Sequence, residues 1–422
     1  MSSPWPANLL TVPLSRVADV QLGKMLQPVP SSPTDVEVRY LRAGSLSGLD
    51  DLQALPVMYA SPTEIFRYAV HTGDLVVAEG GDAGRAEFLP ELPPGVIMQN
   101  SLHCVRAHSA LADVRYIKYC LDAIYASGWL EVICNRATFS HLTKEKLTSL
   151  PMPNRSLTDQ RAVADYLDTE TARIDTLVSA EKKRLNLAVE RLTSAVQHLV
   201  LGGEKSAFAY RKSSASPLAP IPDHWTWRRN KTFLREFVDL SEFGDEELLT
   251  VSHITGVTPR SEKEVTMFLA ESNEGYRRVR RGDLVINTMW AWMGALGVSP
   301  CDGIVSPAYG VYRFNEGAVD EEYFNALYRS PAYVMEMTRY SRGVWTSRLR
   351  LYPEVFLALR TPFPPLSEQR SIAAQVRELN AETARLIDLL KHSIDLLLER
   401  RQALITAAVT GELEIPVQEA VA

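Results

Sequence analysis

Residues 157–161 read LTDQR and residues 366–370 read LSEQR, and each string begins a long segment that contains neither proline nor glycine. The second string follows the first by 209 positions (366 minus 157). Identical residues at this same spacing, before and after these strings, indicate that the chain contains an internal repeat. The same offset pairs Pro153 with Pro362, Glu190–Arg191 with Glu399–Arg400, Gly202 with Gly411, and Gly73–Leu75 with Gly282–Leu284.

The two segments are predicted to be long helices. Their apolar residues fall three, four or seven positions apart, as in a coiled coil. Thr158 and Ser367 are expected to cap the helix starts, and Gly202 and Gly411 to end the helices. Two helices of this kind in one chain should bury their apolar faces against each other, and the repeat favours an antiparallel pair. The alternative is that each helix packs only on its own globular domain. The apolar positions are Val163, Leu167, Ile174, Val178, Leu185, Leu192 and Leu199, and Ile372, Val376, Leu379, Leu386, Leu390, Ile394, Leu397 and Leu404.

The remaining parts of each half mix short Val/Ile/Tyr-rich runs, which indicate strands, with glycine, proline and one amphipathic helix. We therefore predict an α+β fold with two globular domains, here called the first and second reader, each followed by a long helix. The predicted divisions are the first reader at 1–156, a central helix at 157–203, a linker at 204–220, the second reader at 221–365, a C-terminal helix at 366–412 and a tail at 413–422.

Composition narrows the class of protein. Hydrophobic residues make up 46% of the chain, which is enough for ordinary cores. The net charge of −6 is unusual for a nucleic-acid binder unless the basic residues gather on one face. Cys104, Cys120, Cys134 and Cys301 form no CxxC pair and are expected to be buried thiols. Without a signal peptide or an apolar run long enough to span a membrane, the expected location is cytoplasmic.

The paired L[ST][DE]QR strings, each after a proline-containing stretch and each opening a long helix, resemble the two conserved regions of specificity subunits of type I restriction–modification systems. Residues 287–299 (NTMWAWMGALGVS), 303–313 (GIVSPAYGVYR) and 247–257 (ELLTVSHITGV) are similar to sequences of that family's second recognition domain. Residues 40–46 and 22–28 are more weakly similar to sequences of its first domain. The resemblance covers nearly the whole chain.

The resemblance implies a non-catalytic DNA-specificity subunit. Each reader would be a target recognition domain that binds one half of a bipartite site in double-stranded DNA. The helices would set the distance between half-sites and dock two modification (methyltransferase) subunits, with a restriction subunit joining for cleavage. S-adenosylmethionine, ATP and Mg²⁺ would then bind to those partners and none of them to this chain. The helix residues implied in docking are Gln160, Arg161, Glu190, Arg191, Gln369, Arg370, Glu399 and Arg400.

Arginine and lysine contact DNA phosphates, and they read base edges together with Asn, Gln, Ser and Thr. Three clusters of these residue types are candidates, and two of them directly precede the end of a reader. In the first reader the candidates are Asn135, Arg136, Thr138, Ser140, His141, Lys144 and Lys146; in the second they are Arg277, Arg278, Arg280 and Arg281, and then Arg339, Arg342, Trp345, Thr346, Arg348 and Arg350. The alternative for each cluster is a solvated face. Weaker candidates are Lys24, Arg39, Arg42 and Arg85.

Two tryptophans and two aspartates are expected to have structural roles. Trp290 and Trp292 can stack on a displaced base, but tryptophans of this kind are more often core residues. Asp74 and Asp283 are expected to satisfy the amides of their own turns, and no partner acid for catalysis is visible. No phosphate loop, metal-ligand cluster or [DNS]PP[YF] methyltransferase motif occurs. The rival functions are a coiled-coil scaffold with protein-binding heads and, less favoured, a nuclease that acts alone.

Overall fold

The computed structural model describes residues 3–47, 55–134, 141–203, 210–211, 216–218, 220–262, 272–315, 317, 319–343 and 349–416. The chain divides into two compact units. Unit 1 comprises Met1–Glu181 and His392–Ala422, and unit 2 comprises Lys182–Lys391. The helices α5 (Leu157–Val200) and α9 (Leu366–Thr410) each contribute to both units. Each unit therefore holds one reader together with the beginning of one long helix and the end of the other.

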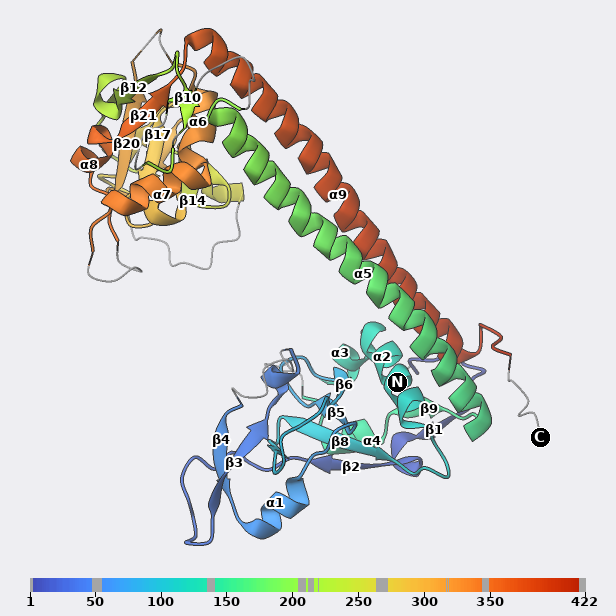
Figure 1. Ribbon diagram of the computed structural model, residues 1–422. Helices are drawn as coiled ribbons and strands as arrows, with labels where there is room; N and C mark the ends of the chain where they lie inside the picture. The colour runs from blue at the N-terminus through green and yellow to red at the C-terminus, as the bar shows by residue number, and fades with distance from the viewer. Residues whose placement is uncertain are drawn as a thin grey trace. The chain divides into compact units, whose positions relative to one another are not determined.

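The first reader is built on an antiparallel four-stranded sheet, in the order β2-β8-β5-β6, and α2 packs against it (Figure 1). A smaller sheet, β4-β3-β7, and the pair β1-β9 complete it. The strands are β1 (Thr11–Pro13), β2 (Ala18–Leu22), β3 (Val36–Leu41), β4 (Val57–Ala60), β5 (Leu75–Ala78), β6 (Ala86–Phe88), β7 (Ile97–Met98), β8 (Leu102–Ala107) and β9 (Pro151–Pro153). The helices are α1 (Pro62–Tyr68), α2 (Val114–Ala126), α3 (Trp129–Ile133) and α4 (Lys144–Thr148).

The second reader repeats this plan with the sheet β13-β20-β17-β18 and the pair β12-β21. It adds three further two-stranded pairs: β10-β11, β14-β15 and β16-β19. The strands are β10 (Tyr210–Arg211), β11 (Ile221–Pro222), β12 (Thr226–Arg229), β13 (Leu234–Glu236), β14 (Leu249–Ser252), β15 (Gly256–Pro259), β16 (Arg277–Val279), β17 (Leu284–Asn287), β18 (Leu296–Val298), β19 (Gly303–Val305), β20 (Tyr309–Phe314) and β21 (Arg360–Phe363). The helices are α6 (Glu321–Arg329), α7 (Pro331–Tyr340) and α8 (Pro353–Ala358).

The repeat extends to individual ion pairs. Asp74 precedes β5 and accepts hydrogen bonds from Arg106 on β8, at 2.7 Å, and from the His71 amide. Asp283 precedes β17 and accepts from Arg313 on β20, at 2.8 and 2.9 Å, and from the Arg280 amide. The two aspartates therefore satisfy their own turns, as predicted, and each also ties its turn to the neighbouring strand.

The helices pair in antiparallel fashion. In unit 1, Val163 and Leu167 near the start of α5 share a core with Ile405 and Val409 near the end of α9. In unit 2, Val200 at the end of α5 shares a core with residues 372–376 of α9. This confirms the predicted pairing, and since each reader packs on both helices, the alternative of helices that pack singly is wrong. Leu386 departs from the expected stripe, because 43% of it is exposed.

The cap predicted at Thr158 is also wrong. Helix α5 begins one residue earlier, at Leu157, and the Ser156 hydroxyl accepts from the Asp159 amide at 3.1 Å. Likewise α9 begins at Leu366, before Ser367, and the Pro365 carbonyl accepts from the Glu368 amide.

Cys104, Cys120 and Cys134 are buried as predicted, whereas Cys301 is only partly buried. Burial raises the pKa of Cys104 and of Cys120 to about 12. Within the part of the chain that is described, no helix has the length and apolar character needed to cross a bilayer. In the segment predicted to be a linker, Leu218 is buried in the core of unit 2.

Candidate nucleic-acid interface

Both readers present the same edge, made of a hairpin tip and a loop. The first tip (residues 79–85) joins β5 to β6, and the second tip (residues 288–295) joins β17 to β18. The Leu142 amide donates to the Glu79 carbonyl at 2.7 Å, and the Leu351 amide donates to the Thr288 carbonyl at 2.9 Å. These two hydrogen bonds occupy equivalent positions of the repeat. The bond fastens Leu142, within the predicted DNA-contacting cluster of the first reader, and Leu351, directly after that of the second reader, to the respective tip.

In the second reader, residues 343–349 connect two paired residues, Arg342 and Arg350. Arg342 and Arg350 face each other in an antiparallel bridge, with backbone hydrogen bonds of 3.0 and 2.8 Å. Like charges directly opposite on paired strands repel, so this arrangement favours an anion beside the loop. Arg339, at the end of α7, is exposed and contacts Glu336. The predicted residues Trp345, Thr346 and Arg348 lie outside the described residues.

A cavity of 810 Å³ adjoins the base of this loop. Arg229 and Arg360, from the pair β12-β21, face it together with Arg339 and Arg342. Its aromatic wall is Trp227 and Tyr340, and its acidic members are Glu336 and Glu354. Among the described residues, no acidic side chain pairs with Arg229, Arg342 or Arg360. The cavity is therefore a basic and partly aromatic surface, and the sequence prediction missed Arg229 and Arg360.

In the first reader the equivalent segment of the sequence is residues 135–141. Asn135, Arg136, Thr138 and Ser140 lie outside the described residues. His141 and Lys144 are exposed, and Lys146 donates to the His141 carbonyl at 3.2 Å. Helix α4 follows this segment; it begins at Lys144 and carries Lys146 in its last turn.

A buried histidine contacts Leu142, directly after this segment, and the sequence prediction missed it. The His103 side chain on β8 is fully buried, with Nε2 at 2.8 Å from the Leu142 carbonyl. Burial lowers the pKa of the His103 imidazole, which favours the neutral ring. The Leu142 amide donates to the Glu79 carbonyl and the Leu142 carbonyl contacts His103, so both backbone polar groups of Leu142 are held in place. The only sequence signal is a histidine within an apolar strand, and such a residue is usually structural.

The arginines at 277–281 have mostly internal partners. Arg277 contacts Glu236 at 3.1 Å, and Arg278 contacts Glu246 at 2.7 Å and Asp239 at 3.6 Å. Hydrogen bonds from Ser241 and Arg278 lower the pKa of Glu246 to about 2. These acids offset two of the four charges. Arg280 and Arg281 remain exposed at the start of the turn before β17.

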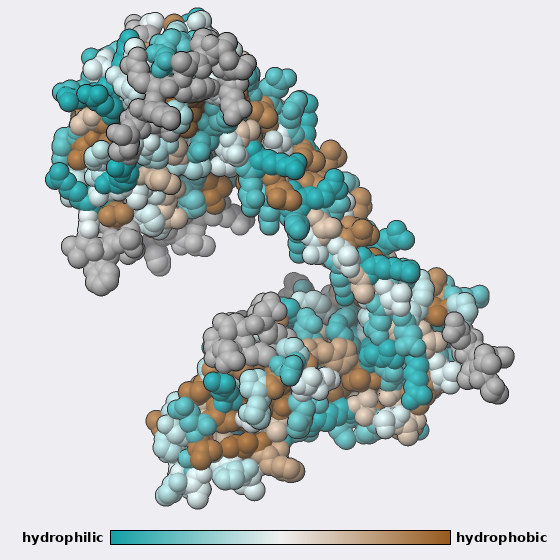
Figure 2. Space-filling model, in the orientation of Figure 1, coloured by the Kyte–Doolittle hydropathy of each residue, from teal (hydrophilic) through white to brown (hydrophobic). Residues whose placement is uncertain are grey.

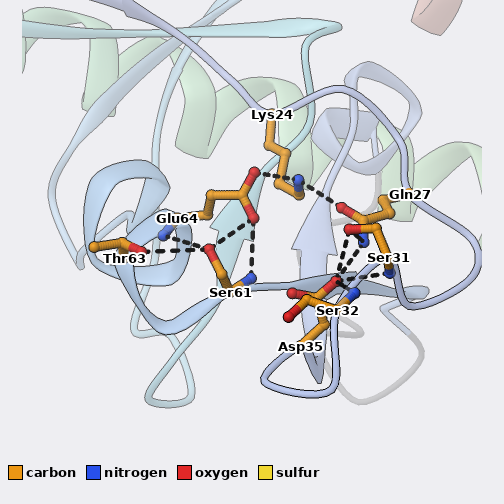
Figure 3. A network of polar contacts seen from close by, with 8 residues as sticks. All are labelled: Lys24, Gln27, Ser31, Ser32, Asp35, Ser61, Thr63 and Glu64. Carbon is orange, nitrogen blue, oxygen red and sulfur yellow. Dashed lines mark hydrogen bonds and ion pairs between the residues drawn. The ribbon is translucent and has the colours of Figure 1, made fainter.

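Two of the four weaker candidates in the first reader, Lys24 and Arg85, form ion pairs within the protein. Lys24 is buried and its Nζ contacts Glu64 at 2.6 Å and Gln27 at 2.9 Å (Figure 3). Its partner Glu64 also completes the capping box of α1 with Ser61. Arg85 pairs with Glu87, whereas Arg39 and Arg42 are exposed. Lys24 therefore holds the loop at residues 24–35 and is unavailable to DNA.

The interpretation of Trp290 as a core residue is wrong. The second tip places 49% of Trp290 and 45% of Met289 at the surface. Trp292 is only partly buried and stacks on Trp290, with ring centroids 6.4 Å apart and an angle of 17° between the planes. The apolar character of this string suggested a core, but its position at a hairpin tip exposes it.

The helix residues implied in docking differ in their exposure. Gln160 and Gln369 are buried and bonded to their own readers. Gln160 accepts from the Asp113 amide at 3.0 Å, and Gln369 from the Asp320 amide at 2.8 Å. Each glutamine thus joins the start of a long helix to the start of a reader helix, α2 or α6. The other members of the set are exposed: Arg161, Glu190, Arg191, Arg370, Glu399 and Arg400.

The long helices also leave apolar side chains at the surface (Figure 2). In unit 1 these are Leu177, Leu396 and Leu398, and in unit 2 they are Leu187, Val189, Leu386 and Leu389. Apolar surface of this kind on a helix is typical of a docking site for another protein. Among the described residues, no cluster of three or more His, Cys, Asp or Glu side chains is placed to hold a metal ion.

No family model and no curated protein matches the sequence. The fold is similar to that of a chain from a structural study of complex assembly and conformational transition in a type I R-M (restriction–modification) system, with a TM-score of 0.66 and 15% identity. The match covers 97% of this chain and 99% of that chain.

Two more distant matches are the HsdS subunit from Thermoanaerobacter tengcongensis, with a TM-score of 0.47 and 15% identity, and the type I restriction–modification S subunit from M. genitalium, with a TM-score of 0.35 and 13% identity. Each covers 97% of this chain, and 98% and 99% of the respective match. The fold that the sequence resemblance implied is thus confirmed over nearly the whole chain by the first of the three matches.

Proposed function

We propose that this chain is the DNA-specificity subunit of a type I restriction–modification complex and reads a bipartite site in double-stranded DNA. The observation that carries the proposal is the repeated edge, where the same backbone hydrogen bond fastens a polar loop to a hairpin tip in both readers. The scaffold is the same, but the residues of tip and loop differ between the two copies. Two copies of one scaffold with unlike edges suit two unlike half-sites.

The charges of the second reader support this function. Arg339, Arg342 and Arg350 flank its loop, and Arg229 and Arg360 extend the basic surface into the adjoining cavity. Phosphate contacts from such residues position a protein on DNA, and bidentate contacts to bases contribute about 1–3 kcal/mol of discrimination each. The net charge of −6 belongs to the whole chain, so it does not oppose a local basic face.

The long helices are the proposed docking site for two modification subunits, with a restriction subunit joining the same assembly. Exposed leucines on both helices offer apolar contact, and Arg161, Arg370 and the Glu-Arg pairs at 190–191 and 399–400 offer charge beside it. Because the repeat places this set twice, it fits two copies of one partner. S-adenosylmethionine, ATP and Mg²⁺ are assigned to those partners, and this chain is proposed to perform no chemistry itself.

Selection of duplexes from a randomised pool tests the proposal. The full chain and its modification subunits would be incubated with the pool at about 150 mM salt, where non-specific phosphate binding is weak. Enrichment of two short, unlike sequences at a fixed separation is the expected result. A stable protein complex that enriches no sequence would overturn the DNA assignment and favour the scaffold. Metal-dependent cutting by the chain alone would favour the nuclease.

A further inference from the structure

The second tip is a rigid aromatic platform. The Trp292 indole Nε1 donates to the Met289 carbonyl at 3.0 Å, and the Trp290 amide donates to the Asn287 carbonyl at 3.0 Å. The Trp290 carbonyl accepts from the amides of Met293 and Ala295. Gly294 ends the turn with φ of 86°, a conformation that side chains disfavour. The backbone on both sides of Trp290 is therefore fixed before any ligand arrives.

The platform presents apolar surface that the fold does not use. The ring planes of Trp290 and Trp292 are nearly parallel, and Trp290 is still half exposed. Met289 extends the same exposed surface. A large indole held in one orientation loses little entropy when it stacks on a ligand, because its backing ring already limits its freedom. These are the properties of a binding surface for a flat, apolar ring.

The platform is bonded to residues next to the basic side chains Arg339 and Arg350 of the second reader. Thr288, directly before Met289, accepts from the Leu351 amide, and Leu351 follows the bridge between Arg342 and Arg350. The Thr338 hydroxyl also donates to the Trp292 carbonyl at 3.3 Å, one residue before Arg339. Aromatic and cationic side chains thus occupy one edge, which matches the stacked bases and charged backbone of a nucleic acid.

The first tip has different chemistry at the equivalent place. Residues 79–85 read EGGDAGR and offer no aromatic side chain. A Cβ on Gly80 would lie 3.3 Å from the His141 ring, so the first loop packs on this tip at a point where a larger residue would crowd it. The shared scaffold therefore forms without an aromatic tip in the first reader.

We propose that Trp290, supported by Trp292, is a stacking wedge that opens one base step in the half-site bound by the second reader. This inference rests on the proposed function. Proteins unstack base steps by inserting apolar side chains, and the loss of base stacking is repaid by stacking on the inserted side chain and by added backbone contacts. Trp290 supplies the stacking surface, and the arginines beside the loop supply the backbone contacts. The half-site bound by the first reader is not opened.

Fluorescent base analogues test the wedge. The full chain with its modification subunits is bound to its selected duplex, in which 2-aminopurine replaces each adenine or pyrrolocytosine each cytosine in turn. Unstacking raises the fluorescence of these bases. The expected result is an increase at one step of the second half-site and none in the first half-site. Trp290→Ala removes the increase and weakens binding by roughly 5- to 140-fold, the equivalent of about 1–3 kcal/mol of stacking at 1.4 kcal/mol per tenfold.

Two variants separate the wedge from a structural role. Trp290→Phe keeps a stacking ring and should retain the fluorescence signal. Phe243→Ala removes another exposed aromatic of the same reader and should leave signal and affinity unchanged.

Other outcomes overturn the wedge. A wild-type complex that selects its bipartite site without any fluorescence change contradicts the wedge but leaves the proposed function intact. If the Trp290→Ala protein binds DNA normally but loses a protein partner, the platform is instead a protein-docking site. If the wild-type complex selects no sequence, the proposed function itself fails.

Discussion

Replacement of Gln369 by methionine should destabilise unit 2 while leaving the exposed residues of α9 unchanged. The Gln369 side chain is fully buried, accepts from the Asp320 amide at 2.8 Å, and donates to the Pro364 carbonyl at 2.9 Å. Methionine keeps the volume but leaves both backbone groups without this partner. Each unpaired buried group costs about 1–3 kcal/mol. Because Asp320 is only partly buried and water can reach its amide, we expect a total loss of about 2–4 kcal/mol.

For a unit of roughly 200 residues, this loss lowers the melting temperature by about 4–16 °C, at 2–4 °C per kcal/mol. Calorimetry of the full chain would record the transition, and hydrogen exchange would assign it to α6 and the start of α9. Gln375→Met is the matched control, because Gln375 is exposed on the same helix and bonds only within its own turn. A Gln369→Met protein that melts like the wild type but fails to bind modification subunits would refute this reasoning and make Gln369 a docking residue.

The remaining predictions concern charge. The double variant Arg229→Gln, Arg360→Gln should reduce the slope of log K for DNA binding against log salt concentration by about 2, without changing the preferred half-site. The control is Arg228→Gln, which should leave the slope unchanged because Arg228, on the same strand, stacks on Phe363. An unaltered slope in the double variant would exclude the cavity as a phosphate site. Burial alone would raise the pKa of the Asp74 carboxyl, but hydrogen bonds from Arg106 and the His71 amide outweigh it and hold the pKa below its ordinary value. The ionised Asp74 therefore stabilises unit 1 at neutral pH, and that stability is lost as the pH falls below about 4. Asp74→Asn should flatten this part of the acid denaturation curve, and an unchanged curve would show that the ion pair contributes little.

Much of the fold could be predicted from the sequence because the signals were local and occurred twice. The proline-free and glycine-free segments specified α5 and α9, and their apolar stripes specified the pairing. The cap of α5 was misplaced because two residues with capping side chains, Ser156 and Thr158, lie near the helix start. The better signal was Asp159, which lies three residues after Ser156 and completes the usual spacing of a capping box.

The site was less predictable because it depends on contacts between distant segments. Arg277 and Arg278 look like free cations in the sequence, but Glu236 on β13 and Glu246 in the loop before β14 reach them. Arg229 and Arg360 were missed because they join the basic surface only through the pairing of β12 with β21. In the same way, burial of Gln160 and Gln369 follows from how the readers pack on the helices, which the repeated motif alone does not reveal.

Exchange of one reader tests the central claim most directly. Residues 1–156 would be replaced by the corresponding domain of a related protein with a different target, and the sites selected from a randomised duplex pool would be compared with those of the parent. We expect one half-site to change while the other half-site and the spacing stay as they were, because each reader carries its own tip and loop. If both half-sites change, or if the exchange leaves the selected sequence unaltered, then the claim that each reader recognises one half-site is wrong.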